Sequence, residues 1–214
     1  MVLISPSIIS SKLAELGEQI KQSEAAHADM FHLDVMDGHF VPNLTMGPDM
    51  VKAIRSVATV PLEVHLMLER PDKYWKKFSN AGADIFLIHY ESMCNIRETF
   101  KEIENSGKKF GIVINPDTPF SKIEQYLDGA HIVLVMSVYP GFSGQSFIEM
   151  SLNNVKEARK FIDKNGLNTM IEIDGGINDV TGKKALDAGA NILVSASYIY
   201  GGNIAERIEK LRSL

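Results

Sequence analysis

The stretch Ala28-Asp29-Met30-Phe31-His32 has three close counterparts later in the chain, at residues 83–87, 130–134 and 190–194. In each copy a small residue and a polar residue precede a short apolar run of the kind that forms a β-strand. Further apolar runs lie between the copies, so the copies fall on every second predicted strand. The repetition predicts a regular alternation of strands and helices along the whole chain.

Eight apolar runs are predicted to be strands. They are Leu3–Ser7, Met30–Asp34, Leu62–Met67, Ile85–His89, Phe110–Ile114, Ile132–Met136, Met170–Asp174 and Ile192–Ser195. The segments between them have helical spacing, as in the stripe Leu13, Leu16, Ile20 and the stripe Val155, Ala158, Phe161, Ile162.

Strands that alternate with helices are parallel and joined by helical crossovers. Eight such units within 214 residues predict an α/β protein, a (β/α)8 TIM barrel that forms a single domain over residues 1–214. An open, doubly wound sheet is the alternative architecture. The glycine-rich dinucleotide-binding turn of such sheets is absent, because Ser5-Pro6-Ser7-Ile8 follows the first strand.

Composition and charge exclude several classes of protein. A net charge of -5 argues against a nucleic-acid-binding protein, which would carry a basic face. The one cysteine, Cys94, rules out an intrachain disulfide and fits a reducing compartment. The sequence has neither a signal-peptide pattern at Met1 nor an apolar stretch of membrane-spanning length, so we expect a cytoplasmic protein without a membrane partner.

Polar side chains interrupt the apolar pattern near the carboxyl ends of three predicted strands. His32 and Asp34 lie two residues apart and therefore face the same side of their strand, while His65 and Asp174 lie near the ends of two others. In a barrel all four would converge at the C-terminal mouth, where barrel enzymes place their active sites. Two imidazoles and two carboxylates suit one divalent metal ion, Zn²⁺, Fe²⁺, Mn²⁺ or Co²⁺. The absence of lysine and arginine from these strand ends favours a metal as the partner of the buried aspartates.

Four other polar residues are assigned more ordinary roles. Glu172 shares a strand face with Asp174 and is expected to make a hydrogen bond one layer deeper. Asp37 lies beyond its strand and is predicted to stabilise a turn. His89 and His131 are interpreted as core histidines whose hydrogen bonds are satisfied, the commoner role for a single strand histidine.

Small residues gather in the loops that follow the last three predicted strands. They belong to the segments Gly141-Phe142-Ser143-Gly144, Gly175-Gly176 and Ala196-Ser197. Glycine allows backbone N–H groups to approach an anion, and these loops are a recurrent phosphate cradle in barrels. At the same mouth, Met36, Met67 and Met136 are expected to line the pocket with polarizable apolar groups.

Four longer motifs contain these residues. They are His32-Leu33-Asp34-Val35-Met36-Asp37-Gly38-His39-Phe40-Val41-Pro42-Asn43, Glu63-Val64-His65-Leu66-Met67, Pro140-Gly141-Phe142-Ser143-Gly144-Gln145-Ser146-Phe147 and Glu172-Ile173-Asp174-Gly175-Gly176. Together they closely resemble the signature of the ribulose-phosphate 3-epimerase family. That family has a (β/α)8 barrel and interconverts D-ribulose 5-phosphate and D-xylulose 5-phosphate, so the resemblance implies a metal-dependent enzyme of the pentose-phosphate pathway and a homo-oligomer.

The resemblance also implies roles for individual residues. His32, Asp34, His65 and Asp174 would bind the metal, and Asp34 and Asp174 would form the acid–base pair. Ser7, His65 and Asp174 would contact the sugar, while Gly141–Gly144, Gly175–Gly176 and Ala196–Ser197 would hold the phosphate. Two positions depart from the family's usual residues and bear on substrate preference: Tyr139 replaces Asn or Glu, and Ala196 replaces Gly.

Several other functions compete with this interpretation. The closely similar allulose-6-phosphate 3-epimerases use the same apparatus on D-allulose 6-phosphate. Decarboxylases and lyases with phosphate-binding barrels use an Asp-x-Lys arrangement, whereas this chain has Asp34-Val35-Met36. An isomerase that moves the carbonyl needs no opposed carboxylates, and a non-catalytic barrel that binds sugar phosphates would not require both.

Overall fold

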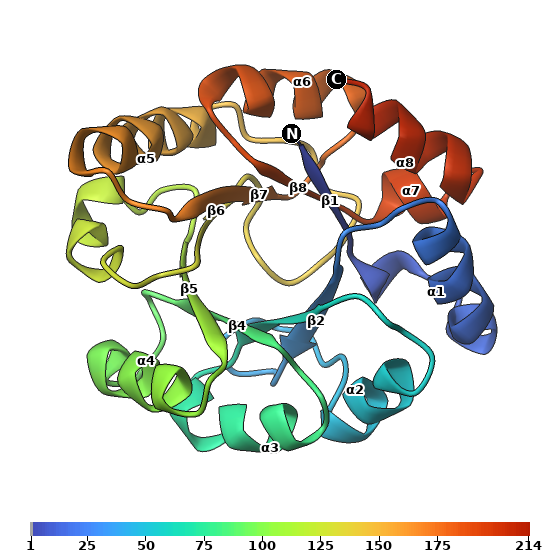
Figure 1. The fold of residues 1–214 in the computed structure, drawn as a ribbon, viewed down its shortest axis with the longest axis horizontal. Coiled ribbons are helices and arrows are strands. Elements are labelled where there is room, and N and C mark those ends of the chain that lie inside the picture. Colours follow the sequence, from blue (N-terminus) through green and yellow to red (C-terminus); the bar gives the residue numbers. More distant parts are fainter. Residues whose placement is uncertain (1) are drawn as a thin grey trace.

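In the computed structural model, which describes residues 2–214, eight parallel strands form one sheet that curls into a barrel (Figure 1). The strands are β1 (Leu3–Pro6), β2 (Phe31–Met36), β3 (Leu62–Met67), β4 (Ile85–His89), β5 (Lys109–Ile114), β6 (Ile132–Met136), β7 (Met170–Asp174) and β8 (Ile192–Ser195). From β2 to β8 each strand pairs with the next one in sequence, and β1 pairs with β8. This order confirms the predicted (β/α)8 barrel.

Helices surround the ring of strands on its outer side (Figure 1). They are α1 (Leu16–Ala25), α2 (Pro48–Arg55), α3 (Trp75–Asn80), α4 (Ile96–Asn105), α5 (Ser151–Asn165), α6 (Asp179–Ala188), α7 (Ser197–Tyr200) and α8 (Ile204–Arg212). Short 3-10 turns lie at Ile8–Ser10, Leu13–Glu15, Pro71–Lys73, Phe120–Lys122 and Glu124–Tyr126. No helix within residues 2–214 combines the length and apolar character needed to cross a bilayer.

The crossover between β5 and β6 departs from the expected helical pattern. It contains two 3-10 turns, Phe120–Lys122 and Glu124–Tyr126, where a helix was predicted. Pro116 and Pro119 lack backbone N–H groups, and the backbone at Pro119 is extended. Too few residues then remain before β6 for a regular helix.

The helical stripe at the start of the chain is confirmed only in part. Ile20 is fully buried on α1, but Leu13 is 69% exposed and lies in a 3-10 turn before the helix. The helix begins at Leu16, so Leu13 does not share its buried face. The stripe on α5 is confirmed, since Val155, Ala158 and Ile162 are buried.

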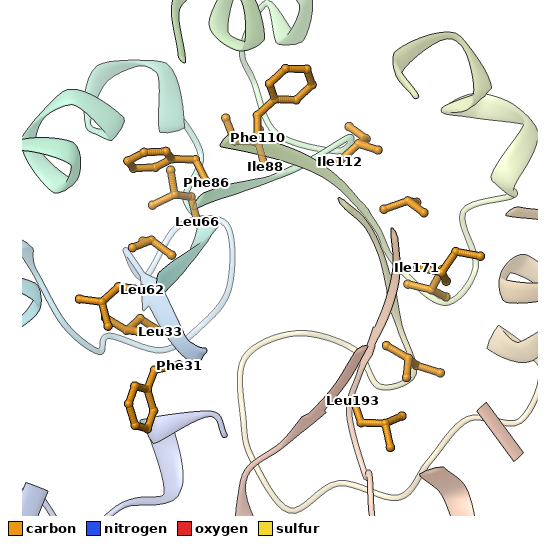
Figure 2. Packing of buried hydrophobic residues seen from close by; sticks show 14 of the residues in the cluster. Phe31, Leu33, Leu62, Leu66, Phe86, Ile88, Phe110, Ile112, Ile171 and Leu193 are labelled. Carbon is orange, nitrogen blue, oxygen red and sulfur yellow. The ribbon is translucent and has the colours of Figure 1, made fainter. Parts of the chain in front are cut away.

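Alternation along the strands produces two apolar layers. Side chains that point outward, such as Phe31, Leu33 and Phe86, pack between the strands and the helices (Figure 2). Side chains that point inward, such as Leu87 and Leu134, fill the barrel interior. Because inward positions recur at every second residue, polar residues two apart on one strand stack along the barrel axis.

The barrel closes between β1 and β2 through few contacts. Ser7, just after β1, forms a single parallel bridge with His32. Nearer the N-terminal end, Ile4 N donates to Asp29 Oδ2 over 2.8 Å, and Asp29 N donates to Ile4 O over 3.0 Å. Arg212 of α8 binds the same Asp29 carboxylate at 2.6 Å, so the last helix also supports this seam.

Replacing Asp29 with alanine should destabilise the barrel by about 1–3 kcal/mol, because the buried Ile4 N–H loses its acceptor. Urea denaturation of the purified variant measures this loss. Asp29→Asn keeps an acceptor oxygen and should lose less. An Asp29→Ala protein that unfolds at the urea concentration of the wild type would show that the seam does not depend on this bond.

Candidate active site

The four residues predicted to bind a metal lie together at the C-terminal mouth of the barrel. His32 and Asp34 come from β2, His65 from β3 and Asp174 from the end of β7. Each contributes one nitrogen or oxygen atom to a group whose members all lie within 4.8 Å of one another. The two histidines are fully buried, and Asp34 is 5% exposed.

Their atoms are arranged like a set of ligands around one point. His32 Nε2 lies 3.1 Å from His65 Nδ1 and 3.4 Å from Asp34 Oδ1. His65 Nδ1 lies 3.2 Å from the same Asp34 oxygen, and Asp174 Oδ2 lies 3.8 Å from His32 Nε2. Within the described part of the chain, the ion pairs of both aspartates are with histidines, not with lysine or arginine. Two imidazole nitrogens and two carboxylates without a fixed cation fit a divalent metal.

The two aspartates have opposite protonation tendencies. Burial acts to raise the pKa of Asp34, but the charges and hydrogen bonds of His32 and His65 outweigh it and lower that pKa. Burial raises the pKa of Asp174 to about 7, with the Asp34 charge adding to the effect against the opposing attraction of His32. At neutral pH Asp34 is therefore ionised while Asp174 is partly protonated, and two carboxyl groups whose pKa values are pushed apart in this way can act as an acid–base pair.

The two histidines also differ. Burial disfavours charge on His32, but the Asp34 charge and the close carboxylates of Glu172 and Glu63 raise its pKa well above the ordinary value. Burial lowers the pKa of His65 to about 3, so this imidazole is neutral and has one nitrogen free as an acceptor or ligand.

A second polar layer supports His32 from inside the barrel. His32 Nδ1 lies 2.7 Å from Glu63 Oε1 and 3.3 Å from Glu172 Oε1, and all three side chains are fully buried. Glu172 thus lies one layer deeper, as predicted, but within the described residues neither of its carboxylate oxygens forms the hydrogen bond that was expected. Glu63 was not singled out from the sequence. Its signal was its position two residues before His65, the same spacing that relates Glu172 to Asp174.

Ser7, for which the resemblance implied a contact with the sugar, lies beside the metal-type cluster. Its hydroxyl donates to Asp34 Oδ2 over 2.5 Å, and its N–H donates to Ser195 O on β8. The side chain is 1% exposed. Ser7 therefore links both neighbouring strands to the carboxylate at the centre of the site.

A pocket at the mouth brings the predicted residues of the loops to this cluster. Its walls include Ser7, Asp34, Met36, Met67, Met136, Gly141, Phe142, Ser143, Gly144, Asp174, Gly175, Gly176, Ala196 and Ser197. Tyr139, one of the two positions expected to bear on substrate preference, is not among the lining residues and is 53% exposed. Ala196 has φ -107°, so its backbone does not occupy the left-handed region that favours glycine.

The loop after β6 arcs over the centre of the barrel, where Figure 1 draws it in yellow. Gln145 Nε2 fastens it internally by donating to the carbonyl oxygens of Tyr139 and Phe142 over 2.7 and 2.9 Å. Asn43 Nδ2, from the loop after β2, donates to Gly141 O over 2.7 Å. Loops from opposite sides of the mouth are thereby joined above the cluster.

Asp37 has the turn role predicted for it. Its Oδ1 accepts from the N–H groups of His39 and Phe40, both over 2.9 Å. Its Oδ2 accepts from Glu69 N over 2.8 Å and so ties the loop after β2 to the loop after β3. Asp37 belongs to the support of the mouth and not to the metal-type cluster.

His89 and His131 occupy different ends of the barrel. His89 is fully buried, as expected, but its Nε2 lies 2.8 Å from His65 Nε2 and therefore contacts the cluster. His131 precedes β6 and lies 3.2 Å from Lys109 Nζ, away from the mouth. The sequence alone offered no local motif that set His89 apart.

Two imidazoles and two carboxylates lie together in the C-terminal mouth of a (β/α)8 barrel. This arrangement is typical of a barrel enzyme with a metal-binding site. The family model described as the ribulose-phosphate 3 epimerase family matches residues 3–200. The chain belongs to this family and is an epimerase, an enzyme of the isomerase class.

Curated relatives extend over nearly the whole chain. The ribulose-phosphate 3-epimerase of Bacillus subtilis is 46% identical over 202 residues, covering 94% of this chain and 93% of the relative. The chloroplastic ribulose-5-phosphate-3-epimerase of Arabidopsis thaliana is 45% identical, with 99% and 76% covered. The Escherichia coli ribulose-phosphate 3-epimerase is 42% identical, with 92% and 88% covered.

Solved structures of low sequence identity share the fold. A 3-hexulose-6-phosphate synthase superposes with a TM-score of 0.72 at 16% identity, covering 99% of each chain. A tryptophan synthase α-subunit of Pyrococcus furiosus gives 0.71 at 12% identity, covering 100% of this chain and 98% of that one. At this identity the likeness supports the barrel alone.

Two glycines of the pocket test how tightly its loops are packed. A Cβ on Gly175 would lie 2.6 Å from Val138 Cγ2 and 2.8 Å from Val138 N, whereas nothing lies within 4 Å of one on Gly144. Both have positive φ, so Gly144→Ala should cost about 1–2 kcal/mol from backbone strain. Gly175→Ala should cost about 1–3 kcal/mol more from the added clash. Urea denaturation compares the two variants, and equal losses would argue against tight packing at Gly175.

Proposed function

We propose that the protein inverts C3 of a ketose phosphate and interconverts D-ribulose 5-phosphate and D-xylulose 5-phosphate. The observation that carries the proposal is the pair of carboxyl groups, Asp34 and Asp174, with oppositely shifted pKa values beside two imidazoles. The names of the relatives support the pentose substrate and a place in the pentose-phosphate pathway.

His32 Nε2, His65 Nδ1 and the carboxylates of Asp34 and Asp174 would hold one divalent metal, Zn²⁺, Fe²⁺, Mn²⁺ or Co²⁺. When bound, the metal supplies positive charge that stabilises the negative charge developing on the oxygens of the ketose. Glu63 would orient His32 from the opposite ring nitrogen, 2.7 Å away.

The two aspartates would move the proton. The C3–H bond breaks, the proton passes to the ionised carboxylate, and the electron pair forms a C2–C3 double bond as the C2 carbonyl becomes an enediolate oxygen. The other carboxyl group gives its proton to the opposite face of C3, and the electrons return to the C2 carbonyl. The lowered pKa of Asp34 suits the proton acceptor and the raised pKa of Asp174 suits the donor. Their roles exchange when the reaction runs in reverse.

The rest of the pocket would bind and orient the sugar phosphate. Ser7 and His65 would contact the sugar, and the backbone N–H groups of Gly141–Gly144, Gly175–Gly176 and Ala196–Ser197 would hold the phosphate. Met36, Met67 and Met136 would exclude water from the reacting carbon. The cytoplasmic location and the homo-oligomeric state expected from the sequence stay predictions.

Exchange of hydrogen at C3 tests this function directly. The metal-loaded protein is mixed with D-ribulose 5-phosphate in D₂O, and deuterium at C3 is followed by NMR together with epimer formation. We expect both to appear, because the donated proton comes from solvent. D-allulose 6-phosphate is tested in parallel, and faster turnover of that ketose would assign the hexulose function instead. Exchange with neither ketose by protein that holds its metal would overturn epimerisation and favour a binding role.

Replacing either aspartate with asparagine should lower turnover by at least about 10²–10⁴-fold, because an amide neither accepts nor returns the C3 proton. Asp34→Asn and Asp174→Asn are compared with Asp128→Asn, an exposed residue far from the pocket. Steady-state rates and circular dichroism of all three proteins are measured. Turnover at the wild-type rate by either folded site variant would remove that residue from the acid–base pair.

A further inference from the structure

A line of hydrogen-bonded side chains leads from the metal-type cluster through the barrel wall. His65 Nε2 lies 2.8 Å from Nε2 of His89, the last residue of β4. His89 Nδ1 lies 3.2 Å from Glu91 Oε2, in the loop that follows. Both imidazoles are fully buried, so neither ring has water as an alternative partner.

At the Glu91 end of this line, the directions of the hydrogen bonds are fixed, that is, which atom donates and which accepts. Glu91 Oε1 accepts from Asn115 N over 3.0 Å and from the Thr118 hydroxyl group. A backbone N–H can only donate, so Glu91 Oε1 acts as an acceptor. Hydrogen bonds and the His89 contact also lower the pKa of Glu91 against the opposing effect of burial. His89 Nδ1 must therefore carry the ring proton, which leaves His89 Nε2 with a lone pair.

The polarity continues to the inner end of the line. A lone pair on His89 Nε2 calls for a proton on His65 Nε2. In the neutral ring this leaves His65 Nδ1 without a proton, against the opposing attraction of the Asp34 carboxylate 3.2 Å away. His65 Nδ1 is the atom that lies 3.1 Å from His32 Nε2 and 3.2 Å from Asp34 Oδ1. We propose that Glu91, acting through His89, is a positioning residue that fixes the tautomer of His65 so that Nδ1 is free to bind a divalent metal. This inference rests on the metal site of the proposed function.

The surrounding structure keeps the line in place. Asn154 of α5 donates to Thr118 O and accepts from Phe120 N, each over 3.0 Å. These bonds fix the loop after β5, which donates two hydrogen bonds to the Glu91 carboxylate. The Phe40 ring lies 4.7 Å from the His89 ring, centre to centre, and restricts its rotation. Partners of this kind orient metal-binding histidines and select their tautomer.

Glutamine at position 91 would reverse the direction of the hydrogen bond to His89 while keeping the size and shape of the side chain. Glu91 uses both oxygens as acceptors, one toward Asn115 and Thr118 and the other toward His89. Gln has one oxygen, which the Asn115 N–H and the Thr118 hydroxyl group would keep. Its NH₂ group would then face His89 Nδ1 and require a lone pair there. His89 would donate from Nε2 instead, which would place the His65 proton on Nδ1.

Glu91→Gln should therefore weaken binding of Zn²⁺ by about 10–100-fold, the usual range for an outer partner of a ligating histidine. Zn²⁺ affinity is measured by competition with a chelator on metal-free wild type, Glu91→Gln and the exposed control Glu124→Gln. Histidine ¹⁵N NMR of the metal-free proteins locates the His65 proton. We expect Nε2 in the wild type and the control, and a shift toward Nδ1 in Glu91→Gln.

The outcomes separate this inference from the proposed function. A wild type that binds no Zn²⁺ would contradict the metal site itself. A wild type that binds Zn²⁺ while folded Glu91→Gln binds it equally well would overturn the role of Glu91 alone. A purely structural role would lower the stability of the metal-free variant without changing the affinity or the tautomer. Should Glu91→Gln fail to fold, the wild-type spectrum decides, because a His65 proton on Nδ1 would also overturn the inference.

Discussion

The hydrogen bond between His32 Nδ1 and Glu63 Oε1, 2.7 Å long and fully buried, fixes the centre of the molecule. It joins β2 to β3 inside the barrel, where their register places these two residues side by side. Because Glu63 binds His32 Nδ1 from inside the barrel, His32 Nε2 points toward the mouth, where it contacts Asp34 and His65. A buried carboxylate and a buried imidazole are each costly alone, so each requires the other. The apolar strands, the closed ring and the covering helices together supply the dry interior in which this pairing is favourable.

Much of this arrangement could be predicted from the chain itself, for physical reasons that also explain the failures. The strand β6, a continuous apolar run, was predicted to the residue because burial on both faces leaves a clear signal. The four cluster residues were found because charge at the end of such a run needs an explanation. His89 and Glu63 were not, because the first lies at a strand end like any core histidine and the second lies within a strand whose partner is remote in sequence. The prolines before Phe120 could be read from the sequence. Whether a helix could still form in the β5–β6 crossover depends on how few residues remain between Phe120 and the start of β6.

The same barrel is shared by proteins of 12–16% identity that carry other names, so its outline does not determine the chemistry. The inward-facing polar residues and the loops above them distinguish this chain. The loops are held together by specific bonds, from Asn43 to Gly141 and from Asp37 to Glu69, and not by apolar packing alone. A mouth tied in this way keeps the pocket loops in fixed positions above side chains that belong to the strands, as the orientation of a small ligand requires.

The seam between β1 and β2 has a consequence for how the protein is made. β1 pairs with β8, which is completed only near the end of the chain, and the carboxylate that fastens β1 to the seam is bound by Arg212. A chain emerging from the ribosome therefore cannot close its barrel until synthesis is almost finished. Ser7, which contacts Asp34, lies just after β1 and takes its place between β8 and β2 at that last step. An incomplete chain without β8 would thus lack both the closed ring and the strand pairing that places Ser7 beside Asp34.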